Sequence, residues 1–268
     1  MALVEVRNLT KIFESGFLSR RATVAVDNVS FDIKSKEIVS LVGESGSGKT
    51  TTGRIILRLL PPTSGSVKFE GKDIWRDIKN NSEVKNYWRM VQPVFQDPYA
   101  SFNPSYKVDR VLNLALRFIG IDEDSATGRD MIREALEYVG LNPSEILGKY
   151  PHQLSGGQRQ RILIARCWII KPKLIVADEA VSMVDASLRG SIVALFKKMS
   201  DDYGTSILFI THDIFLASSI SDRILVMYRG KIVEEGEPDE IIRSPKNEYT
   251  KHLIESMPRL YRKWEDMP

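Results

Sequence analysis

Residues 43–50 read Gly43-Glu44-Ser45-Gly46-Ser47-Gly48-Lys49-Thr50, and the rest of the chain can be interpreted outward from them. The apolar run Ile38–Val42 before them is rich in β-branched residues and predicts a buried strand, and Thr51–Leu60 after them has a helical pattern. Glycines between a strand and a helix let successive backbone N–H groups turn inward around a phosphate, at the positive end of the helix. The stretch therefore predicts a phosphate-binding loop.

The loop matches the pattern G-x-x-x-x-G-K-[ST] in full. Lys49 would supply a cation for the β- and γ-phosphates, and the Thr50 hydroxyl would bind Mg²⁺. A purely structural turn is the alternative, but a lysine beside three glycines has no packing role. The loop predicts a nucleotide without saying which reaction follows. The residues expected to contact the nucleotide here are Gly43, Glu44, Ser45, Gly46, Ser47, Gly48, Lys49, Thr50 and Thr51.

Composition excludes several classes of protein. Lys and Arg number 38 against 35 Asp and Glu, which is too balanced to argue for a nucleic-acid partner. No apolar run approaches the ~20 residues that span a bilayer, and no secretory signal is visible at the N-terminus. The single cysteine, Cys167, excludes an internal disulfide and predicts a small buried side chain. A cytoplasmic protein is the simplest expectation.

Strands are expected over Leu3–Val6 and Val24–Ile33, and they predict an antiparallel sheet beside the nucleotide core. Phe13, between them, could stack on an adenine ring or belong to the core, and the residues alone favour the core. Farther along, Gln96–Pro104 has two prolines and no period, so a loop is expected, with an amide at its head suited to a water or a metal ion.

Residues 108–150 have helical periodicity and look like a helical insert in an α/β frame. After the insert, Ser155-Gly156-Gly157-Gln158 opens a long helix that ends near Ile170, which predicts a second anion-binding helix start. Near the C-terminus, Ile224–Gly236 has the pattern of a hairpin, and two short helices are expected over Pro238–Ser244 and Glu248–Ser256.

Two buried strands are expected to end in polar residues. Leu174–Ala177 leads to Asp178 and Glu179, and a second strand leads to His212. Ligands bind at the carboxyl ends of strands in open parallel sheets. One carboxylate could hold Mg²⁺ while the other orients or deprotonates a water molecule, and the histidine could contact a γ-phosphate. A lone histidine is more often structural.

Together these residues resemble the ATP-binding subunit of ABC transporters, from about residue 4 to residue 260. The resemblance also favours adenine stacking for Phe13. The matching motifs occur in the family's order: Walker A at Gly43–Thr50, the Q-loop glutamine Gln96, the signature Leu154-Ser155-Gly156-Gly157-Gln158, the Walker B aspartate Asp178, the catalytic glutamate Glu179 and the switch histidine His212.

The resemblance implies an α/β P-loop NTPase fold with a mixed central sheet, an N-terminal antiparallel β subdomain and an inserted helical signature subdomain. One ABC ATPase domain would span residues 1–268. Its RecA-like core with the antiparallel sheet would be residues 1–96 and 157–235, its helical subdomain 97–156, and its short helical extension 236–268.

The resemblance also implies a mechanism in which two ATPase subunits, alike or different, clamp ATP head to tail. Ser155, Gly156, Gly157, Gln158 and Asp185 would then act on nucleotide held by the partner. Mg²⁺ would be held by Thr50, Gln96 and Asp178, and catalysis would depend on Lys49, Gln96, Glu179 and His212. Transmembrane permease subunits would dock near Gln96–Pro104, at the cytoplasmic face of the membrane, and a solute-binding protein would act indirectly.

Within the family, Gln96–Pro104 and Ser244–Thr250 look most like the oligopeptide, dipeptide and nickel importer group, some of whose members carry oligosaccharides. Ala180 and Ser182-Met183-Val184-Asp185 depart from the family's usual proline and Ser-Ala-Leu-Asp. The C-terminal cysteine cluster of some members is missing, so no iron–sulfur centre is expected. The alternative is a soluble ABC ATPase of DNA repair or translation without a membrane partner. The chain lacks the coiled-coil insertion, zinc cysteines and second cassette typical of that class.

Overall fold

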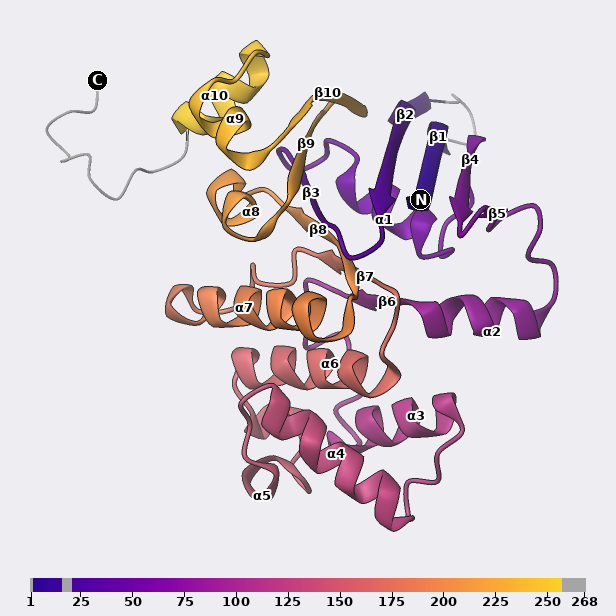
Figure 1. Ribbon diagram of the computed structural model, residues 1–268, viewed down its shortest axis with the longest axis vertical. Coiled ribbons are helices and arrows are strands. Elements are labelled where there is room, and N and C mark those ends of the chain that lie inside the picture. The colour runs from indigo at the N-terminus through magenta and orange to yellow at the C-terminus, as the bar shows by residue number, and fades with distance from the viewer. Residues whose placement is uncertain (1, 16–20, 257–268) are drawn as a thin grey trace, which may run out of the picture.

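The computed structural model describes residues 2–15 and 21–256, and its strands form two sheets (Figure 1). The smaller sheet has the order β2-β1-β4-β5 and is antiparallel throughout. Alternating apolar residues of β1, such as Val4 and Val6, are buried, as expected for a strand with one face on a core. The predicted antiparallel sheet is therefore confirmed. Its strands are β1 (Ala2–Ser15), β2 (Arg21–Lys34), β4 (Ser64–Phe69) and β5 (Lys72–Asp73).

The larger sheet has the order β10-β9-β3-β8-β7-β6, and its strands are parallel except for β10. All residues of β3, β7 and β8 are buried, which suits parallel strands covered on both faces. The predicted α/β fold with a mixed central sheet is confirmed. The strands are β3 (Ile38–Val42), β6 (Val91–Val94), β7 (Leu174–Asp178), β8 (Ser206–Thr211), β9 (Arg223–Tyr228) and β10 (Lys231–Gly236).

Helices between β6 and β7 gather at one end of the molecule, with α7 between them and the sheet (Figure 1). One continuous apolar cluster joins this group to the sheet, because buried residues of α3, α4 and α6 pack together with those of α7 and β8. The group comprises α3 (Asp109–Ile119), α4 (Ala126–Tyr138), α5 (Pro143–Ile146), the 3₁₀ turn η1 (Pro151–Gln153) and α6 (Gly156–Ile170). The other helices are α1 (Lys49–Ile56), α2 (Asn81–Met90), α7 (Ala186–Tyr203), α8 (Ile214–Ile220), α9 (Pro238–Arg243) and α10 (Glu248–Ser256).

The first helix ends earlier than the sequence pattern predicts. The expected helix extends to Leu60, but α1 ends at Ile56 and Arg58 adopts a left-handed conformation with φ 58°. Its guanidinium donates hydrogen bonds to the carbonyls of Ile74 and Ile78, which hold the chain in the turn. The apolar residues after Ile56 therefore continue the core without continuing the helix.

Helix α2 was not expected, because residues 76–86 are mostly polar. Its start is fixed by a capping box, in which the Asn80 side chain accepts from the Glu83 N–H and the Glu83 carboxylate accepts from the Asn80 N–H. The Tyr87 side chain is fully buried and its hydroxyl donates to the carbonyl of Ile56. One anchored aromatic residue thus stabilises a helix that has little other apolar surface.

Candidate functional site

The loop between β3 and α1 has the backbone conformation of a phosphate cradle. Gly43 has φ 152° and Gly48 has φ 108°. A Cβ atom at Gly43 would lie 2.1 Å from the carbonyl oxygen of Met227, and one at Gly48 would lie 2.3 Å from that of Ala25. Larger residues at these positions would therefore force β9 and β2 away from the loop.

The Lys49 side chain is buried within this loop. Its Nζ donates to the carbonyls of Gly43 and Glu44, each at 2.7 Å, and to Ser47 Oγ at 3.3 Å. Burial lowers the pKa of Lys49, although the nearby carboxylates, above all Glu179, oppose that shift. The ammonium group therefore lies at the mouth of the cradle, held by neutral acceptors.

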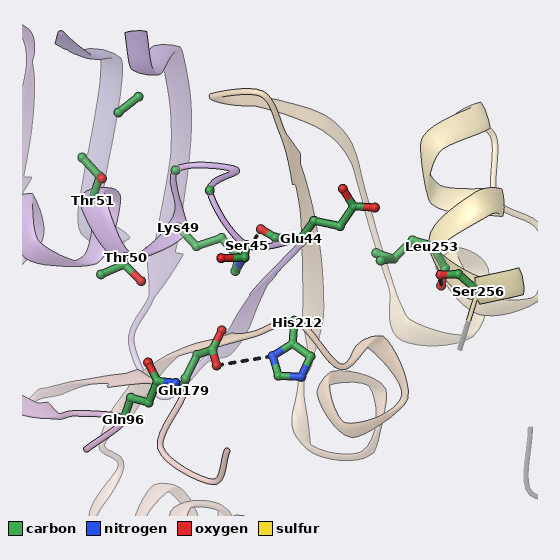
Figure 2. A pocket seen from close by; sticks show the side chains of 13 residues that line it. Glu44, Ser45, Lys49, Thr50, Thr51, Gln96, Glu179, His212, Leu253 and Ser256 are labelled. Atoms are coloured by element: carbon green, nitrogen blue, oxygen red, sulfur yellow. Dashed lines mark hydrogen bonds and ion pairs between the residues drawn. The ribbon is translucent and has the colours of Figure 1, made fainter. Parts of the chain in front are cut away.

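A cavity of about 730 Å³ opens over the loop (Figure 2). Gln96 reaches it from the loop after β6, Glu179 from the end of β7, and His212 from the end of β8. Parallel strands bring their carboxyl ends to one edge of the sheet, so residues far apart in sequence meet there. The full lining is Ala25, Glu44, Ser45, Gly46, Gly48, Lys49, Thr50, Thr51, Gln96, Glu179, His212, Leu253 and Ser256.

Thr50 and Asp178 form the most direct contact between the loop and a strand end. Thr50 Oγ1 donates to Asp178 Oδ1 at 3.0 Å, and Asp178 is buried. Burial raises the pKa of Asp178, and the hydrogen bond from Thr50 opposes the shift. A hydroxyl beside a carboxylate is an oxygen donor set that suits Mg²⁺, which commonly takes one or two carboxylates together with substrate phosphates. Within the described residues, no cluster of three or more His, Cys, Asp or Glu side chains forms a separate metal site.

Glu179 points toward His212 (Figure 2), and its Oε2 lies 3.3 Å from His212 Nδ1. Glu179 has φ 48°, a left-handed conformation that is uncommon for a residue with a side chain. Its N–H donates to the carbonyl of Ile210 on β8 at 2.9 Å, which holds the turn. A strained residue at a strand end, beside a cavity, is a frequent feature of functional sites.

Phe13 does not line the cavity, and it is not a core residue either. It lies on β1 with 41% of its surface exposed, under the ammonium group of Lys11 at 5.3 Å from the ring centroid. The interpretation of Phe13 as core is therefore wrong. Among the described residues, the Lys11 ammonium group lies over this ring, and adenine stacking stays a prediction.

The signature residues also lie outside the cavity. Ser155 caps α6, since its Oγ accepts from the Gln158 N–H at 3.2 Å and the Gln158 side chain accepts from the Ser155 N–H at 3.0 Å. A Cβ at Gly156 would lie 3.2 Å from the Met183 carbonyl oxygen, so the signature packs against the segment that leads to Asp185. The sequence predicted these positions as nucleotide contacts, and in one chain they form a second surface: Ser155, Gly156, Gly157, Gln158 and Asp185.

Three lining residues were missed by sequence reasoning. Ala25 belongs to β2, and its carbonyl packs against Gly48. Leu253 and Ser256 belong to α10, more than two hundred residues after the loop, and apolar periodicity alone gives no signal of that approach.

Comparison with known proteins agrees with this geometry. The family model for the ABC transporter matches residues 26–182. The chain is also 42% identical to the oligopeptide transport ATP-binding protein OppF of Bacillus subtilis (strain 168), over 96% of this chain and 82% of that protein. The chain belongs to the ABC transporter family. A second family model, the oligopeptide/dipeptide transporter C-terminal region, matches residues 233–268.

A further relative and a solved structure are also similar to this ABC protein. The dipeptide transport ATP-binding protein DppF of Lactococcus lactis subsp. cremoris (strain MG1363) is 43% identical, over 96% of this chain and 81% of its own length. Among solved structures, the dimeric ATP-binding cassette MJ0796 in a post-hydrolysis state with ADP and Pi superposes with a TM-score of 0.77 and 29% identity, covering 88% of this chain and 98% of that one. The predicted P-loop NTPase fold and ATPase activity are confirmed, and the fold binds ATP or ADP. ABC ATPase domains dimerise and work with permease subunits.

Among the described residues, no helix is both long and apolar enough to span a membrane. Cys167 is buried on α6, as predicted, and burial raises its thiol pKa.

Proposed function

We propose that this ABC subunit binds Mg·ATP and hydrolyses it to drive the import of dipeptides or oligopeptides. The observation that supports hydrolysis is the cavity that Lys49, Thr50, Glu179 and His212 line together, with the buried Asp178 hydrogen-bonded to Thr50. The peptide substrate is supported by the names of the relatives and by the matching C-terminal region. Nickel and oligosaccharides are the alternatives within the importer group.

In the proposed mechanism, the glycine loop and Lys49 bind the β- and γ-phosphates. The Thr50 hydroxyl, the Asp178 carboxylate and the Gln96 amide oxygen would hold Mg²⁺, which would supply positive charge beside the phosphates. Glu179 orients and deprotonates the attacking water as general base. His212 steadies the γ-phosphate and holds the Glu179 carboxylate in place, since the two side chains lie 3.3 Å apart.

A second ATPase subunit completes the site in this proposal. Ser155–Gln158 and Asp185 lie outside the cavity of their own chain, on a surface at the start of α6 and α7. A head-to-tail pair would carry that surface to the partner's γ-phosphate, where the N-terminus of α6 stabilises negative charge. The dimeric state of the structural relatives supports this arrangement.

Permease subunits would dock beside the loop Gln96–Pro104, at the cytoplasmic face of the membrane. An apolar groove of about 570 Å³ lies there, between the end of α1, α2 and α3, and exposed Leu59 and Leu114 line it together with Trp88. Such a groove fits a short amphipathic helix from a membrane subunit. Arg159 of α6 stacks on Tyr99 of the loop, with the guanidinium carbon 3.4 Å from the ring centroid. The loop beside the groove is therefore in direct contact with the signature helix.

The test is transport by the complete complex. Vesicles containing the permease subunits, the ATPase subunits and the solute-binding protein are loaded with ATP on the side of this chain, and uptake of a labelled oligopeptide is followed. Uptake should require ATP and should be lost in Glu179→Gln. Nickel and a maltooligosaccharide, tested separately, decide the substrate. ATP-dependent uptake of one of these without peptide uptake would contradict the peptide assignment.

A further inference from the structure

The C-terminal helix α10 contacts the phosphate loop through one side chain. Tyr249, in the first turn of α10, accepts a hydrogen bond on its hydroxyl oxygen from the backbone N–H of Glu44 at 2.9 Å. Its ring stacks on Tyr228, with the ring centroids 4.1 Å apart. Stacking fixes the ring plane and thereby the place of the hydroxyl. The contact joins the loop to a residue of the motif Ser244–Thr250. The proposed catalysis and the proposed subunit docking do not involve this motif.

The hairpin β9–β10 also contacts this loop, at Ser47 and at Gly43. The Gly230 N–H donates to the Ser47 carbonyl at 2.9 Å. The Met227 carbonyl lies so close to Gly43 that a Cβ there would be 2.1 Å away. Tyr228 follows Met227 directly, so the hairpin also carries the ring on which Tyr249 rests. The phosphate loop is therefore held by two elements that follow it in sequence by about two hundred residues.

Hydrogen bonds at the start of helix α10 and the burial of Leu253 farther along hold this helix in place. The Asn247 side chain accepts from the Tyr249 N–H at 2.9 Å, and the Glu234 carboxylate on β10 accepts from the N–H groups of Lys246 at 2.7 Å and Asn247 at 3.1 Å. Leu253 is buried in an apolar cluster with Val42, the last residue of β3. The hydroxyl of Tyr249 is thus presented by a helix whose apolar residues share a cluster with the end of the strand that leads into the loop.

We propose that Tyr249 is a positioning residue for the phosphate loop, an inference that rests on the proposed binding of ATP by that loop. Tyr249 does not line the cavity and acts through Glu44. Holding the Glu44 N–H orders the loop before ATP arrives, so less conformational entropy is lost on binding. The C-terminal helices of this chain therefore set nucleotide affinity, and a partner that displaced α10 would weaken it.

The variant Tyr249→Phe tests this by removing the acceptor while keeping the stacked ring. Tyr203→Phe is the matched control, because the Tyr203 hydroxyl also accepts one hydrogen bond at 2.9 Å, from Trp168 Nε1, at the far end of α7. ATP titrations of the full chain should give a Kd about three- to tenfold higher for Tyr249→Phe, the usual scale for one neutral hydrogen bond. The Kd of Tyr203→Phe should be unchanged. Amide exchange of residues 44–47 should be faster in Tyr249→Phe only, with α10 exchanging as in the unaltered chain.

The variant Lys49→Ala distinguishes a failure of the positioning role of Tyr249 from a failure of the proposed ATP site. If Lys49→Ala binds ATP more weakly but Tyr249→Phe binds it as the unaltered chain does, the positioning role is overturned and the ATP site stands. If neither variant loses affinity, the ATP site itself is overturned. If Tyr249→Phe loses affinity together with exchange protection throughout α10, Tyr249 serves only the packing of that helix, and the positioning role is again overturned.

Discussion

At the scale of single residues, Phe13 gives a sharp test of nucleotide contact. Its ring is 41% exposed on β1, so its removal costs little packing. Stacking of a base on an aromatic ring contributes ~1–3 kcal/mol by alanine substitution. Phe13→Ala should therefore raise the Kd for ATP by about tenfold, while Phe13→Trp should retain most of the affinity. Fluorescence titration with a nucleotide analogue measures both.

Tyr106→Ala is the control for this prediction, because Tyr106 is a similarly exposed aromatic residue that lines a different cavity, beside α3. It should bind ATP normally. Equal affinity in Phe13→Ala and in the unaltered chain, with thermal unfolding showing both to be folded, would exclude stacking.

The positions of site residues were predictable where sheet topology decides them. Asp178, Glu179 and His212 follow buried strands, and parallel strands must bring such residues to one edge. Tyr249 illustrates the opposite case. Its proposed role depends on where α10 packs, which is set by the apolar cluster that contains Leu253 and Val42 rather than by any local pattern. Phe13 is a further case, since the residues alone favoured the core and the side chain is 41% exposed on β1.

At the scale of elements, the core strands were predictable from continuous β-branched runs, whereas α2 and α8 were not. Helix α8 is short and is capped by Asp213, whose carboxylate accepts from the N–H groups of Phe215 and Leu216. A cap of this kind stabilises a helix that has too few turns for a clear period. The end of α1 was also misplaced, because tertiary hydrogen bonds of Arg58 override the local helical pattern.

The loop Gln96–Pro104 leads to a prediction about coupling. Tyr99 is 58% exposed and stacks on Arg159, while Phe102 is buried in the main apolar cluster. Tyr99→Ala should leave ATP binding by the isolated chain intact and reduce peptide uptake per ATP hydrolysed in vesicles. Phe102→Ala should instead destabilise the fold by about 3–5 kcal/mol. Full transport by Tyr99→Ala at an unchanged ratio of peptide to ATP would contradict coupling through this loop.

The stability that Glu234 gives to the connection between α9 and α10 should depend on pH. Burial raises its pKa, but hydrogen bonds that include those from the N–H groups of Lys246 and Asn247 outweigh burial, so the pKa lies below its ordinary value of 4.5. A lowered pKa in the folded state means that ionised Glu234 stabilises the fold above about pH 4.5 and that this contribution is lost as the pH falls through the folded value.

Glu234→Gln tests that dependence. Loss of about 1 kcal/mol at neutral pH would lower Tm by roughly 2–4 °C in a chain of this size. The difference from the unaltered chain should be constant from pH 7 to pH 5 and should shrink below the ordinary pKa of 4.5. Glu235→Gln, next on β10, is a poor control because Glu235 pairs with the mostly buried Arg223. Glu248→Gln on α10 is suitable, because Glu248 is 88% exposed and its pair with Lys251 lies at the surface, where ion pairs contribute little. A difference that grew as the pH fell would contradict the assigned sign.

At the scale of the whole molecule, the position of the signature away from the cavity fits the proposed dimer, in which each site would take its signature from the other subunit. Ser155 and Gly156 face outward at the start of α6, while Lys49 and Glu179 face the cavity of the same chain. Retained γ-phosphate should therefore hold two chains together, and its hydrolysis should release them.

The single variant Glu179→Gln distinguishes Mg·ATP binding, ATP hydrolysis and dimer formation from one another. Glutamine keeps the size of the side chain and a hydrogen bond to His212, but it cannot accept the proton of the attacking water. Hydrolysis should fall by roughly 10²-fold or more, the usual scale for loss of a general base, while Mg·ATP binding is retained. Gel filtration with Mg·ATP should then show a stable dimer for Glu179→Gln and a monomer for Lys49→Ala, which lacks the phosphate-binding cation. Undiminished hydrolysis by pure Glu179→Gln would refute the role of Glu179. Slow hydrolysis with no dimer would show instead that this chain pairs with a different ATPase subunit. In such a pair, each composite site joins the cavity of one protein to the signature of the other.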